Sequence, residues 1–251
     1  MNVSIREYLE TTLKEVSIDC VIFGFHAGEL KVLLLKWKGT RLWSLPGGRI
    51  YPDEAVSAAA TRILKERTGL KDVFLQQFFT FGDISRYKNY SEKETQKKAE
   101  IAFGENFNNI DTSKRVISIG YYALVEFEKV TAIPDFYTDE CKWWDFDEIP
   151  PLLFDHNEMI ETAIKTLRKE IKTQPVGNLL PRKFTIAEIQ KLYETILNKK
   201  LDRRNFHKLL MSYDFLVKLP EKRTGAANKS PHLYRFDYKK YEKALRDGIS
   251  Y

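Results

Sequence analysis

Residues 45–70 constrain the fold of this chain more than any other stretch. The stretch opens with Pro46, Gly47 and Gly48, and glycine permits backbone angles that side chains forbid, so a tight turn is expected. A run rich in Ala, Ile and Leu follows and predicts a helix that ends near Gly69, the left-handed stop, with Asp53 as its N-cap. The stretch therefore predicts a glycine turn, a short loop and a helix.

The spacing of residues within this stretch is specific. Five residues separate Gly48 from Glu54, and seven separate Glu54 from Arg62. The pattern continues with Leu64, Glu66, Gly69 and Leu70. It resembles the signature of the Nudix family, G-x5-E-x7-R-E-U-x-E-E-x-G-U, in which U is an aliphatic residue.

The metal-binding positions of that signature are altered here. The resemblance implies that an active enzyme carries glutamates at the positions of Ile63, Glu66 and Arg67, which share one face of a helix. Three such carboxylates hold Mg²⁺, a hard cation that prefers oxygen ligands. Here Ile63 offers no ligand atom and the charges of Glu66 and Arg67 cancel. We therefore expect no metal, no cofactor and no metal-assisted hydrolysis.

Charge is distributed unevenly along the 251 residues. Residues 182–251 hold 17 Lys and Arg against 8 Asp and Glu, a net charge of +9, whereas residues 1–181 have a net charge of −3. A basic C-terminal third on a mildly acidic body predicts two domains with different partners, and nucleic acid is the usual partner of the basic one.

Composition places the chain among globular, cytoplasmic proteins. The hydrophobic content is 43%, which suits a sizeable core. We recognise no signal peptide at the start and no apolar run of about 18 residues, the length of a membrane span. Cys20 and Cys141 are too few for a disulfide framework and are expected to pack as free thiols in a reducing compartment. The four histidines have no metal-ligand spacing.

The chain before residue 173 alternates strand and helix patterns. Strands are predicted at residues 19–25, 30–36, 73–81, 116–127 and 142–145. A helix is predicted at residues 154–172, because Ile160, Ile164 and Leu167 recur at helical spacing. Around the glycine turn, this order predicts the Nudix-type α/β/α sandwich with a mixed sheet.

A polar, charged segment at residues 83–115 interrupts this order. Connections of this length are usually functional flaps or disordered, so we interpret the segment as an insertion, with a short helix at 92–103. A further short helix is predicted at 4–16, without an assigned role.

The basic third has the order of a winged helix-turn-helix. Thr185, with Glu188 completing a capping box, starts a helix at 186–197, and Asp202 starts a second at 203–213. A hairpin with strands at 216–219 and 233–236 surrounds a basic loop, and Asp237 caps a last helix. The predicted domains are a Nudix-like sensing domain at 1–173, a Pro- and Gly-containing linker at 174–183, and the winged helix at 184–251.

In such a domain the second helix enters the major groove of DNA by its N-terminal end. Phe206, Leu209 and Leu210 are expected to face inward, which leaves Arg and Asn side chains for guanine and adenine edges. Loop cations would contact phosphates. The predicted DNA-binding residues are Lys183, Arg203, Arg204, Asn205, His207, Lys208, Lys222, Arg223, Lys229 and His232. For any single one, a solvated basic face is the competing interpretation.

A degenerate Nudix domain followed by a winged helix resembles the NrtR- and AraR-like transcriptional regulators of bacteria. Further matching stretches are residues 19–25, 115–118, 121–124, 154–156 and 203–206. The resemblance implies a homodimer that binds double-stranded operator DNA and senses a small effector, ADP-ribose or a related NAD metabolite in some members and a pentose such as L-arabinose in others. The insertion departs from the family pattern, in which that connection is short.

The resemblance also implies where the effector binds. The implied pocket residues are Lys36, Trp43, Gly47, Gly48, Arg49, Glu66, Arg67, Arg115 and Tyr121, with Tyr122 as an alternative to Tyr121. Trp43 either stacks on a sugar or adenine ring or packs in the core. Arg67 serves a phosphate or pairs with Glu66, and Arg62 is expected to pair with Glu66. The helix at 154–172 is the expected mechanical path to the DNA-binding domain.

Two other functions fit the same features. A working Mg²⁺-dependent Nudix pyrophosphatase with an accessory nucleic-acid-binding domain would need Glu54, Glu66 and an insertion carboxylate, such as Glu100 or Glu105, to rebuild the metal site. An RNA-binding module is the other, because a basic winged helix also serves RNA.

Overall fold

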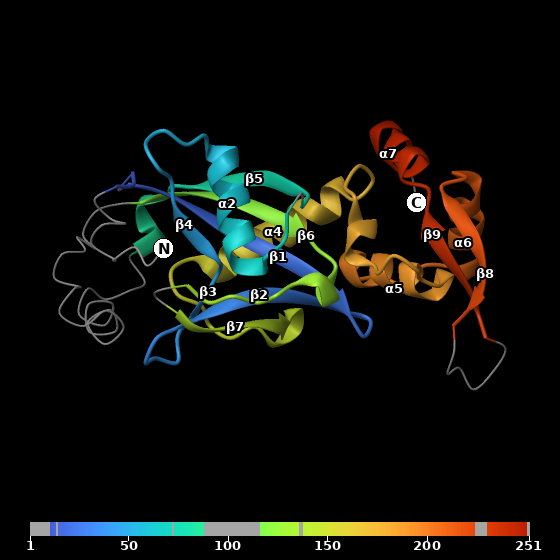
Figure 1. The fold of residues 1–251 in the computed structure, drawn as a ribbon, viewed down its shortest axis with the longest axis horizontal. Coiled ribbons are helices and arrows are strands. Elements are labelled where there is room, and N and C mark those ends of the chain that lie inside the picture. The colour runs from blue at the N-terminus through green and yellow to red at the C-terminus, as the bar shows by residue number, and fades with distance from the viewer. Residues whose placement is uncertain are drawn as a thin grey trace. The chain divides into compact units, whose positions relative to one another are not determined.

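The computed structural model describes residues 11–13, 15–71, 73–87, 116–135, 138–223 and 230–249. The chain forms two compact units (Figure 1). The first unit comprises Met1–Phe23, Lys31–Ala123 and Lys129–Ala163, and the second comprises Gly24–Leu30, Leu124–Glu128 and Ile164–Tyr251. None of the described helices combines the length and the apolar character that crossing a membrane requires.

A seven-stranded sheet organises the first unit. Its strands are β1 (Val16–His26), β2 (Glu29–Trp37), β3 (Trp43–Ser44), β4 (Gly47–Arg49), β5 (Leu75–Phe81), β6 (Ile117–Leu124) and β7 (Thr138–Asp145). The order is β3-β2-β1-β6-β5, with β4 paired to β1 and β7 paired to β2. The pairs β1–β4, β2–β7 and β5–β6 are antiparallel.

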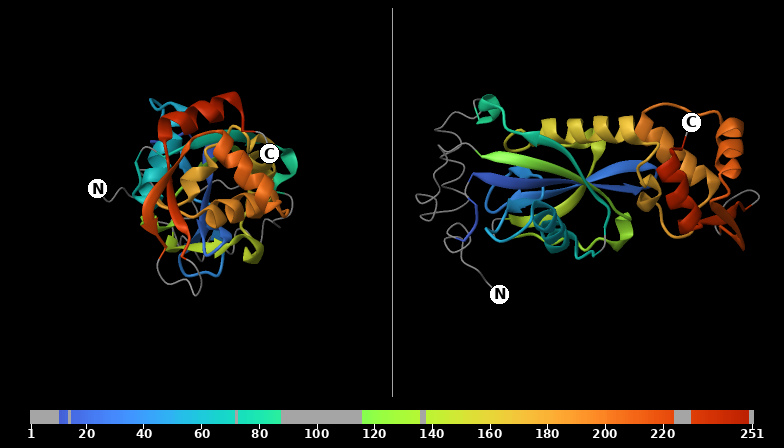
Figure 2. Two further views of the ribbon diagram at one scale, coloured as in Figure 1. Left: turned by 90° about the vertical axis from the view of Figure 1, so that its right-hand side faces the viewer. Right: turned by 90° about the horizontal axis from the view of Figure 1, so that it is seen from above.

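Helices cover both faces of this sheet. Helix α2 (Val56–Thr68) lies on one face, and the first part of α4 (His156–Glu170) lies on the other (Figure 2). Because both faces are covered, β1 and β2 are nearly continuous apolar runs. Short 3-10 helices lie at Ile84–Tyr87 (η1), Phe127–Lys129 (η3) and Phe146–Glu148 (η4). Both cysteines are free thiols, as expected.

The second unit contains two helices, a hairpin and a closing helix. These elements are α5 (Ile186–Leu197), α6 (Arg203–Ser212), β8 (Leu216–Lys222), β9 (His232–Phe236) and α7 (Tyr238–Asp247). Their aromatic core includes Phe215, Phe236 and Tyr241, and the ring centroids of Phe236 and Tyr241 lie 4.3 Å apart in a stacked arrangement. The described elements therefore follow the order predicted for a winged helix.

The segment predicted as a linker packs within this second unit. It contains a 3-10 helix, η5 (Val176–Leu179), whose Val176 is fully buried. The backbone N–H of Gly177 donates to Tyr241 Oη at 2.9 Å. A Cβ at Gly177 would lie 2.7 Å from the Phe236 ring, so glycine permits this close approach.

Helix termini test the local predictions. The capping box of α5 is present, since Thr185 Oγ1 accepts from the Glu188 N–H and the Glu188 carboxylate accepts from the Thr185 N–H. Asp202 and Asp237 cap α6 and α7 as predicted. Gly69 ends α2 at φ 70°. These predictions are confirmed.

The predicted N-cap of α2 is wrong. The helix starts after Ala55 without a side-chain cap, and its first turn holds no acidic residue. Glu54 instead accepts from the Tyr51 N–H at 3.3 Å, which keeps residues 51–54 in the preceding loop. The predicted helix at 92–103 lies outside the described residues. So does most of the predicted helix at 4–16, although Val16 belongs to β1.

Candidate functional site

The glycine turn lies directly against strand β1. Gly47 and Gly48 pair with Asp19 and Ile18. A Cβ at Gly47 would lie 2.3 Å from Asp19 Oδ1, so only glycine fits at this position of the turn. The predicted turn residues are thus held at the sheet surface beside α2, and Arg62 of α2 donates to the Arg49 carbonyl at 2.8 Å.

Arg62 forms the ion pair with Glu66 that the helical spacing predicted, but its shorter contacts are with Glu54. Its Nε and Nη2 donate to the two Glu54 carboxylate oxygens at 2.8 and 2.7 Å. The Glu66 carboxylate lies farther away, at 3.5 Å from Arg62 Nη1. The paired guanidinium lowers the pKa of Glu54. Glu54 therefore stays ionised and fixes the loop to the helix.

The three positions interpreted as replaced metal ligands differ in burial and contacts. Ile63 is fully buried. Arg67 is also buried, and its Nη2 lies 3.2 Å from Asp135 Oδ2 but 3.9 Å from Glu66 Oε2. Within the described part of the chain, no group of three or more His, Cys, Asp or Glu is placed to hold a metal ion. Of the three positions, only Glu66 offers a carboxylate to solvent, with 44% of its side chain exposed.

Lys36 and Trp43 lie opposite each other on β2 and β3. Trp43 is 7% exposed and packs edge-on against Trp144 at a centroid distance of 5.1 Å. The Lys142 ammonium lies over both indole rings, 5.0 Å from Trp43 and 4.4 Å from Trp144. Lys36 Nζ lies 3.5 Å from Glu140 Oε2. The contacts of Trp43 match the core-packing alternative for this residue.

The remaining predicted pocket residues are Arg49, Arg115 and Tyr121. Tyr121 on β6 is buried, and its hydroxyl donates to Gln77 Oε1 on β5 at 3.2 Å. Arg49 donates to the Leu13 carbonyl at 3.2 Å. Arg115 lies outside the described residues. The structure thus places the glycine turn beside α2 and Lys36 beside Trp43, and it gives Tyr121 a hydrogen bond to Gln77.

A buried histidine below the turn was not predicted as a site residue. His156 Nδ1 accepts from the Leu45 N–H at 2.9 Å, and His156 Nε2 lies 3.5 Å from Asp19 Oδ1. Ser118 Oγ donates to the other Asp19 oxygen. Burial lowers the pKa of His156, and nearby Asp19 partly opposes this effect. No spacing rule links His156 to a turn 111 positions earlier, so its partner could not be read from the sequence.

A buried ion pair lies next to this histidine. Arg86 Nη2 donates to Asp155 Oδ1 at 2.8 Å, and Arg86 Nη1 donates to the carbonyls of Phe81 and Val116 at 2.9 and 3.1 Å. Arg86 therefore joins both ends of the segment 82–115 to the residue that precedes α4.

Helix α6 presents a polar face to solvent, as predicted. Phe206 and Leu210 are buried, and Leu209 is half-buried. The exposed residues are Arg203, Arg204, Asn205, His207 and Lys208. Among the predicted wing residues, Lys222 is exposed, whereas Lys229 lies outside the described residues.

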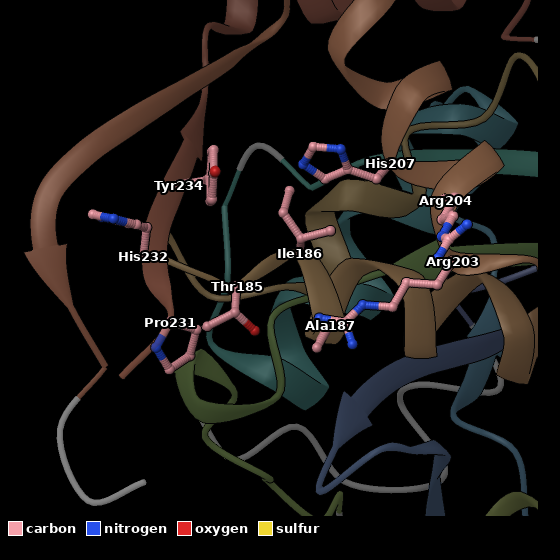
Figure 3. Close-up of a pocket in the computed structure, with 9 residues that line it drawn as sticks. All are labelled: Thr185, Ile186, Ala187, Arg203, Arg204, His207, Pro231, His232 and Tyr234. Atoms are coloured by element: carbon pink, nitrogen blue, oxygen red, sulfur yellow. The ribbon is translucent and has the colours of Figure 1, made fainter. Parts of the chain in front are cut away.

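A hollow of about 620 Å³ lies between the start of α5, α6 and β9 (Figure 3). It is lined by Thr185, Ile186, Ala187, Arg203, Arg204, His207, Pro231, His232 and Tyr234. Nδ1 of His232 is buried and has no hydrogen-bond partner among the described residues. Two predicted DNA-binding arginines and two predicted histidines thus share one hollow.

Two of the predicted DNA-binding residues, Arg223 and Lys183, form ion pairs with carboxylates of the second unit. Arg223 Nη2 lies 2.5 and 2.6 Å from the two Glu188 carboxylate oxygens. Lys183 Nζ lies 2.5 Å from Glu221 Oε2 on an exposed surface. Arg223 therefore ties the end of β8 to the capping box of α5, a role that local sequence could not indicate.

Comparisons with known proteins cover both units. Residues 13–165 match the NUDIX domain model, and residues 176–236 match the model described as the NrtR DNA-binding winged helix domain. The "ADPR responsive transcriptional repressor NtrR" of Acinetobacter baylyi is 24% identical over 235 residues, which is 90% of this chain and 84% of the relative.

Two solved structures resemble this chain over most of its length. The crystal structure of Shewanella oneidensis NrtR is 27% identical, with a TM-score of 0.68, and covers 89% of this chain and 94% of its own. The same protein complexed with a 27mer DNA is 25% identical, with a TM-score of 0.69, and covers 90% of this chain and 94% of its own.

The predicted fold is confirmed by these matches as a Nudix α/β/α sandwich with a mixed sheet, followed by a winged helix. The Nudix model spans more than half of the chain. The protein therefore belongs to the Nudix family and carries an NrtR-type winged helix domain after its Nudix domain.

Proposed function

We propose that the protein is a ligand-responsive bacterial transcriptional regulator. The observation that carries this proposal is the pairing of Arg67 with Asp135 beside a buried Ile63, where a hydrolase would need metal ligands. The exposed polar face of α6 supports a role in reading operator DNA. The relative described as an ADPR responsive repressor supports the same class of function.

ADP-ribose is the effector that we favour, and a pentose such as L-arabinose is the second candidate. The exposed Glu66 carboxylate would accept hydrogen bonds from sugar hydroxyls. The glycine turn and Lys36 lie in the same sheet and would anchor the effector's other groups. Arg67 is a weaker candidate for a phosphate contact, because Asp135 already holds it.

Effector binding is tested by calorimetric titration with ADP-ribose, NAD and L-arabinose. Glu66→Ala should weaken binding of the effector, whereas Lys65→Ala, an exposed neighbour on α2, should leave it unchanged. DNA binding is tested with a duplex that carries the upstream region of the protein's own gene. Failure to bind this duplex at low salt would contradict the regulator proposal.

The alternative is a Mg²⁺-dependent pyrophosphatase, and the solvent-exposed Glu66 is the observation that favours it. We expect no AMP when the protein is incubated with ADP-ribose and Mg²⁺, because Ile63 and Arg67 supply no ligand oxygen. Mg²⁺-dependent release of AMP that Glu66→Gln abolishes would establish the enzyme instead.

We further propose that the regulator acts in the cytoplasm as a homodimer on a palindromic operator. A chain of 29.5 kDa should then elute with twice that mass in light-scattering chromatography. Two-fold symmetric operators match two-fold symmetric proteins, because each half-site meets one recognition helix. A monomeric mass at micromolar concentration would count against the dimer.

A further inference from the structure

Helix α4 belongs to both compact units. Its first residue, His156, lies in the first unit, and from Ile164 onward the helix is part of the second. The helix is continuous over 15 residues, and an unbroken helix transmits displacement along its axis because its backbone hydrogen bonds resist bending. What each end of α4 contacts therefore decides what the helix can connect.

The first end is hydrogen-bonded to the glycine turn. Leu45, the residue before Pro46, donates its N–H to His156 Nδ1 at 2.9 Å. His156 Nε2 lies 3.5 Å from Asp19 Oδ1, the atom against which Gly47 packs. Leu45, His156 and Asp19 are buried, so a shift of the Leu45 backbone is expected to act on His156 through close packing. Such a shift would act directly on the first residue of α4.

The last turn of α4 is hydrogen-bonded to α5. Arg168 Nε donates to the Ile196 carbonyl at 2.6 Å. This carbonyl lies in the last turn of α5, where carbonyls lack partners within the helix and a positive charge is favourable. The α5 cap uses other oxygens, since the Asn198 N–H bonds the carbonyls of Glu194 and Thr195. Arg168 thus supplies a partner to an otherwise open position.

Helix α5 in turn supports the recognition helix. The Tyr193 ring packs on Phe206 of α6 at a centroid distance of 5.5 Å. Thr195 Oγ1 also donates to the Gly28 carbonyl at 3.1 Å, within the same unit. A displacement of the α5 C-terminus therefore reaches α6 through direct packing.

We propose that His156 and Arg168 are positioning residues that couple effector binding at the glycine turn to operator affinity, with α4 as the connector. This inference rests on the proposed regulator function and adds the residues that carry the response. Neither residue needs to touch the effector or the DNA. Each sets the position of one end of α4.

The first test uses Arg168→Met, with Lys169→Met as the matched control. Both replacements remove one positive charge from the last turn of α4, but Lys169 is exposed. The dissociation constant for the duplex with the gene's own upstream region is measured with and without saturating ADP-ribose. Allosteric couplings are commonly about 5- to 150-fold. The response is the ratio of the two dissociation constants, with and without ADP-ribose. We expect Lys169→Met to keep the wild-type ratio and Arg168→Met to bring it toward one.

A second test addresses the other end of α4. His156→Asn keeps an acceptor near Nδ1 for the Leu45 N–H, whereas His156→Leu removes it. We expect Asn to retain a larger share of the response than Leu. The double variant His156→Leu/Arg168→Met should show a change in DNA affinity with ADP-ribose no smaller than that of the less responsive single variant. Two substitutions that interrupt the same coupling are not additive.

The outcomes separate this inference from the proposed function. If the wild type binds DNA with the same dissociation constant with and without each of ADP-ribose, NAD and L-arabinose, the effector proposal and this inference both fail. A wild-type response that Arg168→Met retains in full would remove the inference alone. Equal weakening of DNA binding with and without ADP-ribose would show a merely structural role for Arg168. If Arg168→Met does not fold, Arg168→Lys, which keeps the charge but lacks the planar Nε donor, replaces it in the same comparison.

Discussion

Arg67, which the family signature led us to interpret as a replaced metal ligand, forms a buried ion pair with Asp135. Only 10% of either side chain is exposed. Removing one partner of a buried ion pair leaves the other charge without compensation. The partner of Arg67 thus lies in the segment that precedes β7, which the signature pattern alone does not reveal.

Restoring the glutamate at this position should destabilise the protein. We expect Arg67→Glu to lower the free energy of unfolding by roughly 3–5 kcal/mol, because two buried carboxylates would then face each other. Urea denaturation measures the change. The exchanged pair Arg67→Asp/Asp135→Arg is the control and should recover part of the loss. An Arg67→Glu variant as stable as the wild type would contradict the importance of this pair.

His156 should make stability depend on pH. Because burial lowers its pKa in the folded state, the unfolded chain binds the proton more readily. The stabilisation is then complete above the unfolded pKa of about 6.5 and is lost as pH falls below it. His156→Asn should reduce the slope of unfolding free energy between pH 6.5 and 5 by up to ~1.4 kcal/mol per pH unit. The unfolding free energy is measured by denaturation at each pH. Equal pH slopes for the wild type and His156→Asn would mean that His156 stays protonated in the folded state.

At the scale of elements, local patterns and tertiary contacts differ in how well the sequence reports them. The caps at Thr185, Asp202 and Asp237 follow from neighbouring residues and were predictable. The partner of His156 depends on how distant segments meet, and helical spacing predicted the Arg62–Glu66 ion pair but not the shorter contacts of Arg62 with Glu54. Strand and helix order were likewise predictable from periodicity, whereas the long-range contacts of the side chains around the glycine turn were not.

The predicted linker, residues 174–183, shows the same limit. Its Pro and Gly residues indicated a linker, but composition does not report burial, and Val176 and Leu179 are fully buried. The Gly177 contact with Tyr241 ties this segment to α7. We therefore expect a fragment of residues 172–251 to be more stable than one of residues 184–251. Thermal denaturation followed by circular dichroism compares them, and equal midpoints would mean that the segment contributes nothing to the winged helix.

The wing offers a matched pair of cations with different expected roles. Lys222 is exposed, whereas Arg223 is held by Glu188. Lys222→Gln should lower the slope of log affinity against log salt by about one, the effect of losing one phosphate contact. Arg223→Gln should change this slope less and instead lower thermal stability. Fluorescence anisotropy with duplex DNA at several salt concentrations measures both slopes, and equal losses would assign Arg223 to the DNA.

At the scale of the whole molecule, α4 contributes residues to both compact units. Its buried residues include Met159 and Ala163 in the first unit and Ile164 and Leu167 in the second. A helix of this length is only marginally stable without packing, since isolated helices shorter than about 12–15 residues rarely persist in water. We expect that unfolding of either unit would remove the packing of one part of α4 and thereby weaken the part that belongs to the other unit.

We therefore expect the full chain to unfold in a single calorimetric transition, with a ratio of calorimetric to van't Hoff enthalpy close to one. ADP-ribose should raise the midpoint of that whole transition, because a ligand that binds only the folded state stabilises everything that unfolds with its site. Duplex DNA, which is expected to bind the winged helix of the second unit, should raise the midpoint of the same transition. Two separate transitions, each moved by only one of the two ligands, would show that α4 does not join the units energetically, and the coupling through His156 and Arg168 would then lack its connector.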